Sequence, residues 1–326
     1  MEYLCTPRSR GSRLVAGLVS VVLAVAGVTA CSAPPPPRAR TVLRLTTGTP
    51  GARFYPLGQA LARAYTAALP MLDVRVLDTA GSVANVEALE RGDADVGLSY
   101  ADVAYTAYVG GLDGRQESFA ELRGVAVLEL APVHLVVRAG SKIADPTDLR
   151  GRRVAVGPTG SGSALTAEIV LRALGIDASA VDVEPLKYNE AAARLAAGTI
   201  DALFVNGSDP VDSVRASALA GARILPLGGP AIERLRHDYP FFRPTVIHGG
   251  TYPGHPAPVR TIGVDNLLLC RRGLDEATVH DLTQQFFAQL PSMSILSGLD
   301  LEQAPATPIP LHDGAARYYR ERELSR

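Results

Sequence analysis

Three short segments rich in Gly, Ser and Thr could bind an anion, because each lies where a predicted strand gives way to a predicted helix. They span residues 46–58, 79–85 and 157–163. The first N–H groups of a helix have no partner within the helix, so they favour a negatively charged ligand. One helix end contributes about 0.3–2 kcal/mol, whereas micromolar binding requires about 8 kcal/mol. The segments therefore predict an anion site if several converge on one ligand, and ordinary loops if they do not.

The third segment does not match the motifs that bind nucleotides. A P-loop places Lys before its last Ser or Thr, but here Gly162 is followed directly by Ser163. A dinucleotide-binding loop has the spacing G-x-G-x-x-G, whereas these glycines fall at 157, 160 and 162, which is the reverse spacing. The spacing disfavours nucleotide binding.

No motif in the chain indicates an enzyme or a metal site. The third segment lacks the G-x-S-x-G turn of hydrolases. His134, His248 and His255 are possible bases, but no Ser or Cys motif pairs with them, and the cysteines and histidines lack metal-ligand spacing. We therefore expect no catalytic residues, no metal and no cofactor. An exported hydrolase or transferase is the alternative from a different functional class.

The composition is near neutral and aliphatic. The 326 residues carry a net charge of −1, 47% of them are hydrophobic, 6% are aromatic, and Trp is absent. A chain with no basic cluster is a poor nucleic-acid binder, and the low aromatic content predicts an Ala/Val/Leu core. Cys270 ends an apolar run, where a buried and unreactive thiol is expected.

The N-terminus predicts export and attachment to a lipid. Three arginines precede an uncharged run at 14–28, a pattern typical of a secretory signal peptide and short for a membrane-spanning helix. Val28-Thr29-Ala30-Cys31 resembles a bacterial lipobox, so we expect residues 1–30 to be a lipoprotein signal peptide and Cys31 to be lipidated. Residues 31–40 then form a Pro-rich tether at the outer, periplasmic face of the cell membrane. A signal peptide cut nearby, with an incidental Cys, is the alternative.

Short β-rich runs alternate with Ala-rich amphipathic runs along the rest of the chain, which predicts an α/β fold with open, mostly parallel sheets. The expected strands are 42–46, 74–77, 95–99, 124–128, 134–138, 153–156, 181–185, 202–205, 224–226 and 261–269. The expected helices are 57–68, 83–91, 101–109, 164–174, 190–197, 210–219, 230–237 and 275–290.

Two stretches could carry the chain between two domains. Residues 126–138 hold two β-like segments interrupted at Pro132, and residues 249–263 are rich in Gly and Pro. If both are crossings, domain 1 is discontinuous and comprises 41–132 plus 251–326, while domain 2 comprises 133–250. A small ligand would bind in the cleft between them, where loops at the carboxyl ends of strands meet.

Several short motifs follow one another in an order that resembles a known family. They are YPLG at 55–58, GSVAN at 81–85, GDADVG at 92–97, DVAYTAY at 102–108, LVVR at 135–138, LRGRRVAVGP at 149–158, GSG at 160–162, GTYPG at 250–254 and PLHDGAARYY at 310–319. Over residues 41–321 the chain resembles the TAXI family of solute-binding proteins, the extracytoplasmic receptors of some TRAP transporters.

The resemblance implies a two-domain periplasmic-binding-protein fold of type II that closes on its ligand without a catalytic step. It implies a small carboxylate or amino acid as ligand, similar to glutamate or 2-oxoglutarate, and delivery to a TRAP-type membrane permease driven by an ion gradient. We expect a monomer held at the membrane by its lipid. A lipoprotein of the same fold that signals to a membrane sensor kinase is the alternative.

The resemblance also implies the residues that contact the ligand. They are Gly48, Thr49, Arg53 and Tyr55 in the first segment, Ser82 in the second, Gly160, Ser161, Gly162 and Ser163 in the third, and Asn206, Thr251 and Tyr252 elsewhere. Ser82 would also cap its helix, and Asp102 is expected to cap the next helix rather than contact the ligand.

Three features depart from the family pattern. The first segment has fewer glycines, Tyr100 stands where a polar amide is usual, and the run 204–210 is more polar than expected. Arg53 could supply a cation for a ligand carboxylate, or it could be a solvated side chain at the rim of the cleft. These departures leave the fold unchanged and bear on the identity of the ligand.

Overall fold

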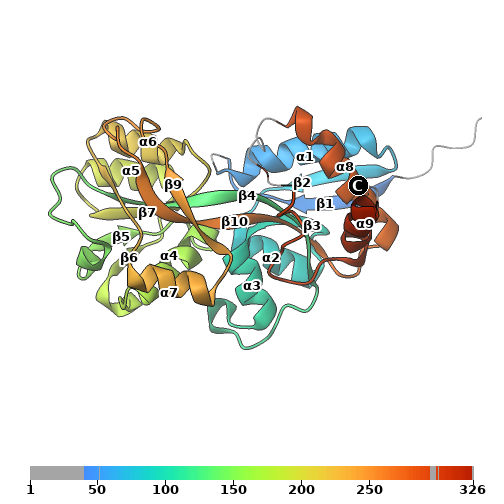
Figure 1. Ribbon diagram of the computed structural model, residues 1–326, viewed down its shortest axis with the longest axis horizontal. Helices are drawn as coiled ribbons and strands as arrows, with labels where there is room; N and C mark the ends of the chain where they lie inside the picture. The colour runs from blue at the N-terminus through green and yellow to red at the C-terminus, as the bar shows by residue number, and fades with distance from the viewer. Residues whose placement is uncertain (1–39, 51, 294–298, 300, 325–326) are drawn as a thin grey trace, which may run out of the picture. The chain divides into compact units, whose positions relative to one another are not determined.

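The computed structural model describes residues 40–50, 52–293, 299 and 301–324, which belong to one compact unit, Ala39–Arg326 (Figure 1). The predicted signal peptide, Cys31 and the tether up to residue 39 lie outside the described residues. Among the helices that are described, none combines the length and the hydrophobicity that a membrane span requires.

The strands form one mixed sheet in the order β2-β1-β3-β10-β4-β7-β5-β6, with β8 paired to β4 and β9 to β10. Their bounds are β1 Thr41–Thr46, β2 Leu72–Leu77, β3 Val96–Tyr100, β4 Leu122–Val137, β5 Arg153–Ala155, β6 Asp182–Glu184, β7 Ala202–Asn206, β8 Arg223–Leu225, β9 Phe242–Ile247 and β10 Val259–Arg271. Pairing is parallel within β2-β1-β3 and within β6-β5-β7, and antiparallel around β4 and β10.

The helices connect these strands and cover the sheet. Their bounds are α1 Phe54–Ala68, α2 Ser82–Arg91, α3 Ala101–Val109, α4 Gly162–Ala173, α5 Tyr188–Ala196, α6 Asp212–Leu219, α7 Pro230–Asp238, α8 Glu276–Gln289 and α9 Asp313–Leu324. Four 3₁₀ turns are also described: η1 Leu112–Gly114, η2 Pro146–Leu149, η3 Ala178–Ala180 and η4 Leu290–Ser292. The α/β class is therefore confirmed.

The long strands β4 and β10 pair with each other and extend across the unit from one end of the sheet toward the other (Figure 1). We call β1–β3, α1–α3, α8 and α9 the first half, and β5–β8 with α4–α7 the second half. The two strands predicted at 124–128 and 134–138 are one strand, so the break expected at Pro132 is wrong. Pro132 is the last β4 residue paired with β10, and Val133 is the first paired with β7. At such a change of partner the missing N–H of a proline is tolerated.

Two elements have no counterpart among the predicted ones. Strand β9 contains Pro244 and pairs with β10 alone, as an edge strand can. Helix α9 is strongly charged and lacks a wide apolar stripe, yet it packs on α8 through stacked Phe287 and Tyr318 rings at 5.2 Å. Both elements owe their stability to tertiary partners, which a local sequence pattern does not contain.

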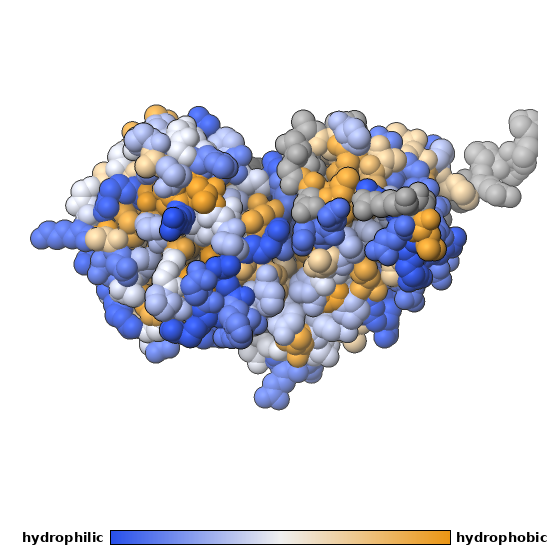
Figure 2. Space-filling view, viewed as in Figure 1, coloured by the Kyte–Doolittle hydropathy of each residue, from blue (hydrophilic) through white to orange (hydrophobic). Residues whose placement is uncertain are grey.

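Aliphatic side chains fill the core, as the composition predicts. Leu268 of β10 is paired with Leu98 of β3 and with Ala126 of β4, and all three are almost fully buried. Cys270 is buried with its thiol free, and burial raises the pKa of that thiol, so the expectation of an unreactive cysteine is confirmed. On the face drawn in Figure 2, hydrophobic residues form small groups separated by polar ones, which does not indicate a broad apolar interface there.

Asp95, just before β3, links β1 and β10 through charged hydrogen bonds. Its carboxylate accepts two bonds from the Arg44 guanidinium at 2.9 Å and one from Arg271 Nε at 3.1 Å. Burial alone would raise the pKa of this carboxyl, but the bonds from the two arginines hold the pKa below its ordinary value of 3.8. The ionised carboxylate therefore stabilises the fold above about pH 4, and that stabilisation is lost as the pH falls further.

Replacing Asp95 by Asn is expected to lower the free energy of unfolding by about 2 kcal/mol at pH 7, the usual worth of hydrogen bonds to a charged group. Urea denaturation from pH 7 down to pH 3 measures the difference from the wild type, which should shrink below about pH 4. Asp93→Asn is the matched control, because Asp93 pairs with Arg91 at the exposed surface. A difference that persists undiminished at pH 3 would contradict the ionic role of Asp95.

Candidate functional site

The three Gly/Ser/Thr-rich segments meet around one small cavity of about 40 Å³. Its walls come from the turn before α1, the start of α2 and the start of α4, and they are completed by Tyr100, Tyr188 and Asn206. Three helix N-termini therefore face a single small cavity. Unpaired N–H groups gathered in this way favour an anionic or strongly polar ligand.

Local sequence sets the position of each helix start. Gly81 adopts φ +130°, a backbone conformation that side chains rarely allow, and precedes the first residue of α2. Thr79 Oγ1 fixes this turn because it accepts from the Gly81 N–H at 3.0 Å and donates to Asn85 Oδ1 at 2.5 Å. At α4, the Ser161 hydroxyl caps the helix by accepting from the Ala164 N–H at 3.3 Å.

Of the twelve residues expected to contact a ligand, seven line the cavity: Gly48, Thr49, Arg53, Ser82, Ser161, Gly162 and Asn206. Gly160 borders an adjoining groove instead, and its carbonyl accepts from the Val83 N–H at 3.2 Å. Ser163 lies behind the wall, where its Oγ accepts from the Asn206 N–H at 3.1 Å and from the Tyr188 hydroxyl at 3.0 Å.

The structure does not bring Tyr55, Thr251 or Tyr252 to the cavity. Phe54 lines it in place of Tyr55, with its ring centroid 5.1 Å from that of Tyr100. Tyr252 is buried in the second half, where its hydroxyl donates to Asp209 Oδ1 at 2.8 Å and so fastens the loop that also contains Thr251. Tyr55 and Tyr252, which each precede a proline, are therefore not in the wall of the cavity as expected.

The capping expectation is wrong for Ser82 and holds in part for Asp102. Ser82 is the first residue of α2, and its hydroxyl accepts from the Tyr100 N–H at 3.1 Å rather than from a helix N–H. Asp102 lies inside the first turn of α3 and not at the N-cap position, but its carboxylate accepts from the Val103 N–H of that turn at 2.8 Å and from the Thr166 hydroxyl on α4. Both side chains are fully buried, and each also joins its helix to a neighbouring element.

Arg53 lines the cavity, but its guanidinium is already paired with the carboxylate of Glu129. Its Nε and one terminal nitrogen each donate to the Glu129 carboxylate at 2.8 Å, in a bidentate pair. A ligand carboxylate would have to compete with Glu129 for this guanidinium fork. The expectation of a cation dedicated to the ligand is therefore not supported by the geometry.

A chain of buried hydrogen bonds links the first half to the second behind the cavity. Asn206 Nδ2 donates to Thr166 Oγ1 at 2.6 Å, and the Thr166 hydroxyl donates to Asp102. The Tyr100 hydroxyl donates to the Asn206 carbonyl at 3.0 Å. Burial raises the pKa of Asp102 to about 6, against the opposing effect of the Thr166 hydrogen bond, so the carboxylate is mostly ionised at neutral pH.

No sequence motif marked Phe54 or Tyr188 as parts of the site, and Tyr100 stood out only as a departure from the family. Tyr188 is the first residue of α5, and its hydroxyl donates to Ser163 Oγ on α4 at 3.0 Å, which places the residue at the cavity. The only local signal was an aromatic residue at the beginning of a helix, which is too common to identify a binding residue.

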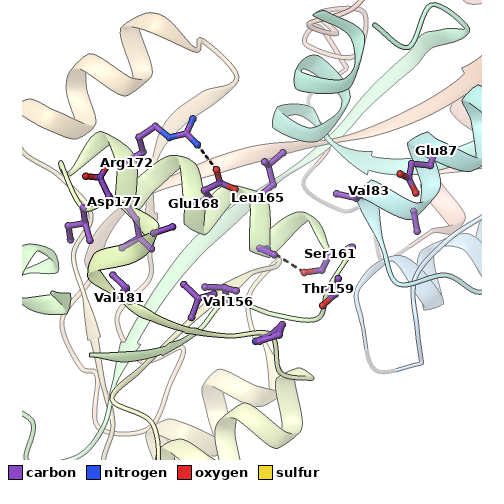
Figure 3. Close-up of a pocket in the computed structure, with 18 residues that line it drawn as sticks. Val83, Glu87, Val156, Thr159, Ser161, Leu165, Glu168, Arg172, Asp177 and Val181 are labelled. Atoms are coloured by element: carbon purple, nitrogen blue, oxygen red, sulfur yellow. Dashed lines mark hydrogen bonds and ion pairs between the residues drawn. The ribbon is translucent and has the colours of Figure 1, made fainter. Parts of the chain in front are cut away.

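A larger groove of about 850 Å³ adjoins the cavity at Ser161, which lines both (Figure 3). Figure 3 draws it between α4, which carries Glu168 and Arg172, and α2, which carries Glu87. Its other walls are mainly aliphatic, and Glu168 is paired with Arg172. Since its lining includes more carboxylates than guanidinium groups, this groove is a poorer anion site than the cavity.

A comparison with known protein families identifies the family of this chain. A family model described as NMT1-like matches residues 45–322, which is most of the sequence. The protein belongs to the NMT1-like family.

Solved structures share the fold of this NMT1-like protein at low identity. MatC from Rhodopseudomonas palustris, solved with bound malate, is 16% identical with a TM-score of 0.54, and the match covers 88% of this chain and 98% of MatC. The periplasmic binding protein BugD is 11% identical with a TM-score of 0.54, covering 89% and 95%. XAC2383 from Xanthomonas citri, bound to ATP, is 15% identical with a TM-score of 0.51, covering 86% and 95%. The predicted periplasmic-binding-protein fold is thus confirmed.

Gly162 lets the walls of the cavity meet in the NMT1-like protein. A Cβ atom at this position would lie 2.2 Å from Tyr100 Cδ2 and 2.6 Å from Ser82 Oγ, both in the first half. We expect Gly162→Ala to lower the free energy of unfolding by about 1–3 kcal/mol through overpacking, and to increase the radius of gyration as the halves separate. Denaturation and small-angle scattering measure the two effects.

Gly228→Ala is the matched control for this substitution, since nothing lies within 4 Å of its added Cβ. If the stability and the radius of gyration of Gly162→Ala equal those of Gly228→Ala, residue 162 is not in tight contact with Tyr100 and Ser82.

Asp102→Asn is expected to change how stability depends on pH. Because the folded-state pKa is raised from 3.8 to about 6, the folded wild type binds a proton between pH 4 and 6 that the unfolded chain does not, and its stability falls as the pH rises through that interval. The stability of the wild type minus that of Asp102→Asn should therefore fall by about 2 kcal/mol from pH 4 to pH 7. Urea titrations across this range measure it.

Asp148→Asn is the matched control for the pH experiment, because backbone N–H groups of Ala144 and Asp145 lower the pKa of that exposed carboxyl. Its difference from the wild type should stay level between pH 4 and pH 7. If the stability difference between the wild type and Asp102→Asn is equally constant over this pH range, the pKa of Asp102 is not raised by burial.

Proposed function

We propose that this protein is an extracytoplasmic solute-binding receptor that captures a small carboxylate or amino acid and carries out no reaction on it. The observation that carries this proposal is the convergence of three helix N-termini on one small cavity. Family membership and the shared fold support it, since MatC was solved with malate, a small dicarboxylate, and BugD is a periplasmic binding protein.

The ligand's acid group would lie against the starts of α2 and α4. The N–H groups of Ser82, Gly162 and Ser163 belong to first helical turns and have no partner within their helices. Phe54, Tyr100 and Tyr188 wall the same space and would exclude water from it. Exclusion of water strengthens each hydrogen bond to the ligand, because the local dielectric constant is low.

Binding would couple to closure of two domains, residues 41–132 plus 251–326 and residues 133–250. Hydrogen bonds join the halves beside the cavity, from the Val83 N–H to the Gly160 carbonyl, from the Tyr100 hydroxyl to the Asn206 carbonyl and from the Thr166 hydroxyl to Asp102. Strands β4 and β10 pass from one half to the other and are the elements that would bend. A ligand that contacts both halves would favour the closed arrangement.

The membrane partner would be a TRAP-type permease driven by an ion gradient. The TAXI resemblance of the ordered motifs between residues 41 and 321 supports this choice. The signal-peptide pattern and the lipobox ending at Cys31 support a receptor that is tethered at the outer face of the membrane. The lipid would keep the receptor close to the permease and so raise the rate of delivery.

Thermal and chemical denaturation with a panel of amino acids, dicarboxylates and keto acids tests the receptor function. A true ligand at one hundred times its Kd should raise the free energy of unfolding by about 2.7 kcal/mol. The methyl ester of that ligand is the matched control, because it has the same shape without the charge and should stabilise far less. If no acid stabilises protein that was refolded from urea to remove carried-over ligand, the proposal is wrong.

A further inference from the structure

Asn206 is a buried polar residue in the wall of the cavity. It ends β7, lines the cavity and is 5% exposed. Its backbone is held from two sides, because its N–H donates to Ser163 Oγ and its carbonyl accepts from the Tyr100 hydroxyl. The side chain is therefore placed rigidly at the wall of the site.

The orientation of the Asn206 amide follows from its neighbours. Asp102 is mostly ionised at neutral pH and can only accept, so the Thr166 hydroxyl gives its proton to that carboxylate. The Thr166 oxygen must then accept from Asn206, which turns the amide NH₂ group toward Thr166 at 2.6 Å. The carbonyl oxygen Oδ1 consequently remains for another partner.

No donor among the described residues lies within hydrogen-bonding distance of Asn206 Oδ1, although this atom is buried. Buried acceptors in folded proteins are almost always paired. A plain carboxylate or keto group offers only acceptors and would leave Oδ1 unpaired, whereas an amino or hydroxyl group would satisfy it. The donor must also lie near the acid group, because Asn206 and the starts of α2 and α4 line the same small cavity.

We propose that the cavity selects acids with an N–H or O–H donor next to the carboxylate, namely 2-amino and 2-hydroxy acids, through Asn206 Oδ1. This inference rests on the proposed receptor function and narrows the class of ligand. Sites built to bond a donor discriminate strongly against analogues that lack it, because the protein acceptor is then buried without a partner. Preference for the donor-bearing acid should be at least about tenfold.

Calorimetric titration of the purified full chain tests the selection with matched ligand series. One series is L-alanine, L-lactate, pyruvate and propionate, and the other is L-glutamate, L-2-hydroxyglutarate, 2-oxoglutarate and glutarate. Within a series only the group at carbon 2 changes. In any series that binds, the amino or the hydroxy member should have a Kd at least tenfold lower than the oxo and unsubstituted members.

Asn206→Leu should bring that ratio close to one, because leucine fills the space without an acceptor. Ser213→Ala is the matched control, since Ser213 Oγ is also buried without a partner among the described residues but lies on α6, outside the cavity lining. This control should keep the wild-type ratio. If Asn206→Leu does not fold, the wild-type series decides alone.

The possible failures are distinguishable. Binding of the oxo or unsubstituted acid as tightly as the amino and hydroxy acids would overturn the selection by Asn206 and leave the receptor function intact. An unchanged ratio in folded Asn206→Leu would overturn it as well. Absence of binding by every member of both series, together with no stabilisation by any acid in the wider panel, would contradict the receptor function itself.

Discussion

The N–H groups at the starts of α2 and α4 are the constraint on which the rest of the site depends. A helix start leaves donors without intrahelical partners, and here the two starts approach closely enough for the Val83 N–H to bond the Gly160 carbonyl. The glycine at 162 makes this approach possible, because a larger residue would collide with Tyr100 and Ser82. The polarity of the cavity is therefore a property of the backbone, and the surrounding side chains determine which polar ligand fits.

The side chains around the cavity differ in how they affect its charge and its hydrogen bonding. Arg53 and Glu129 neutralise each other at the rim, so the site has no strong net charge of its own from this pair. Asp102 lies one hydrogen bond further back and acts on the cavity only through Thr166 and Asn206. The hydroxyl and amide dipoles point their positive ends toward the buried charge, so the acceptor oxygen Oδ1 of Asn206 is left on the side away from Asp102.

Much of the fold could be predicted from local pattern, because helices and strands with regular apolar spacing and marked glycine turns carry their own signal. The three turns were found in this way. The pairing of Arg53 with Glu129 and the position of Tyr188 could not be found, because each depends on segments far apart in the sequence. The break predicted at Pro132 was wrong for the same reason. Whether a proline interrupts a strand depends on the neighbouring strand, and the partner of β4 changes from β10 to β7 at this residue.

The place of β10 in the sheet has a consequence for biogenesis. This strand lies between β3 and β4, so the early part of the chain has a gap in its sheet until residues 259–271 are available. Contacts between segments so distant in sequence form slowly. In a chain that becomes available from its N-terminus, this sheet would therefore stay incomplete until nearly all residues were present.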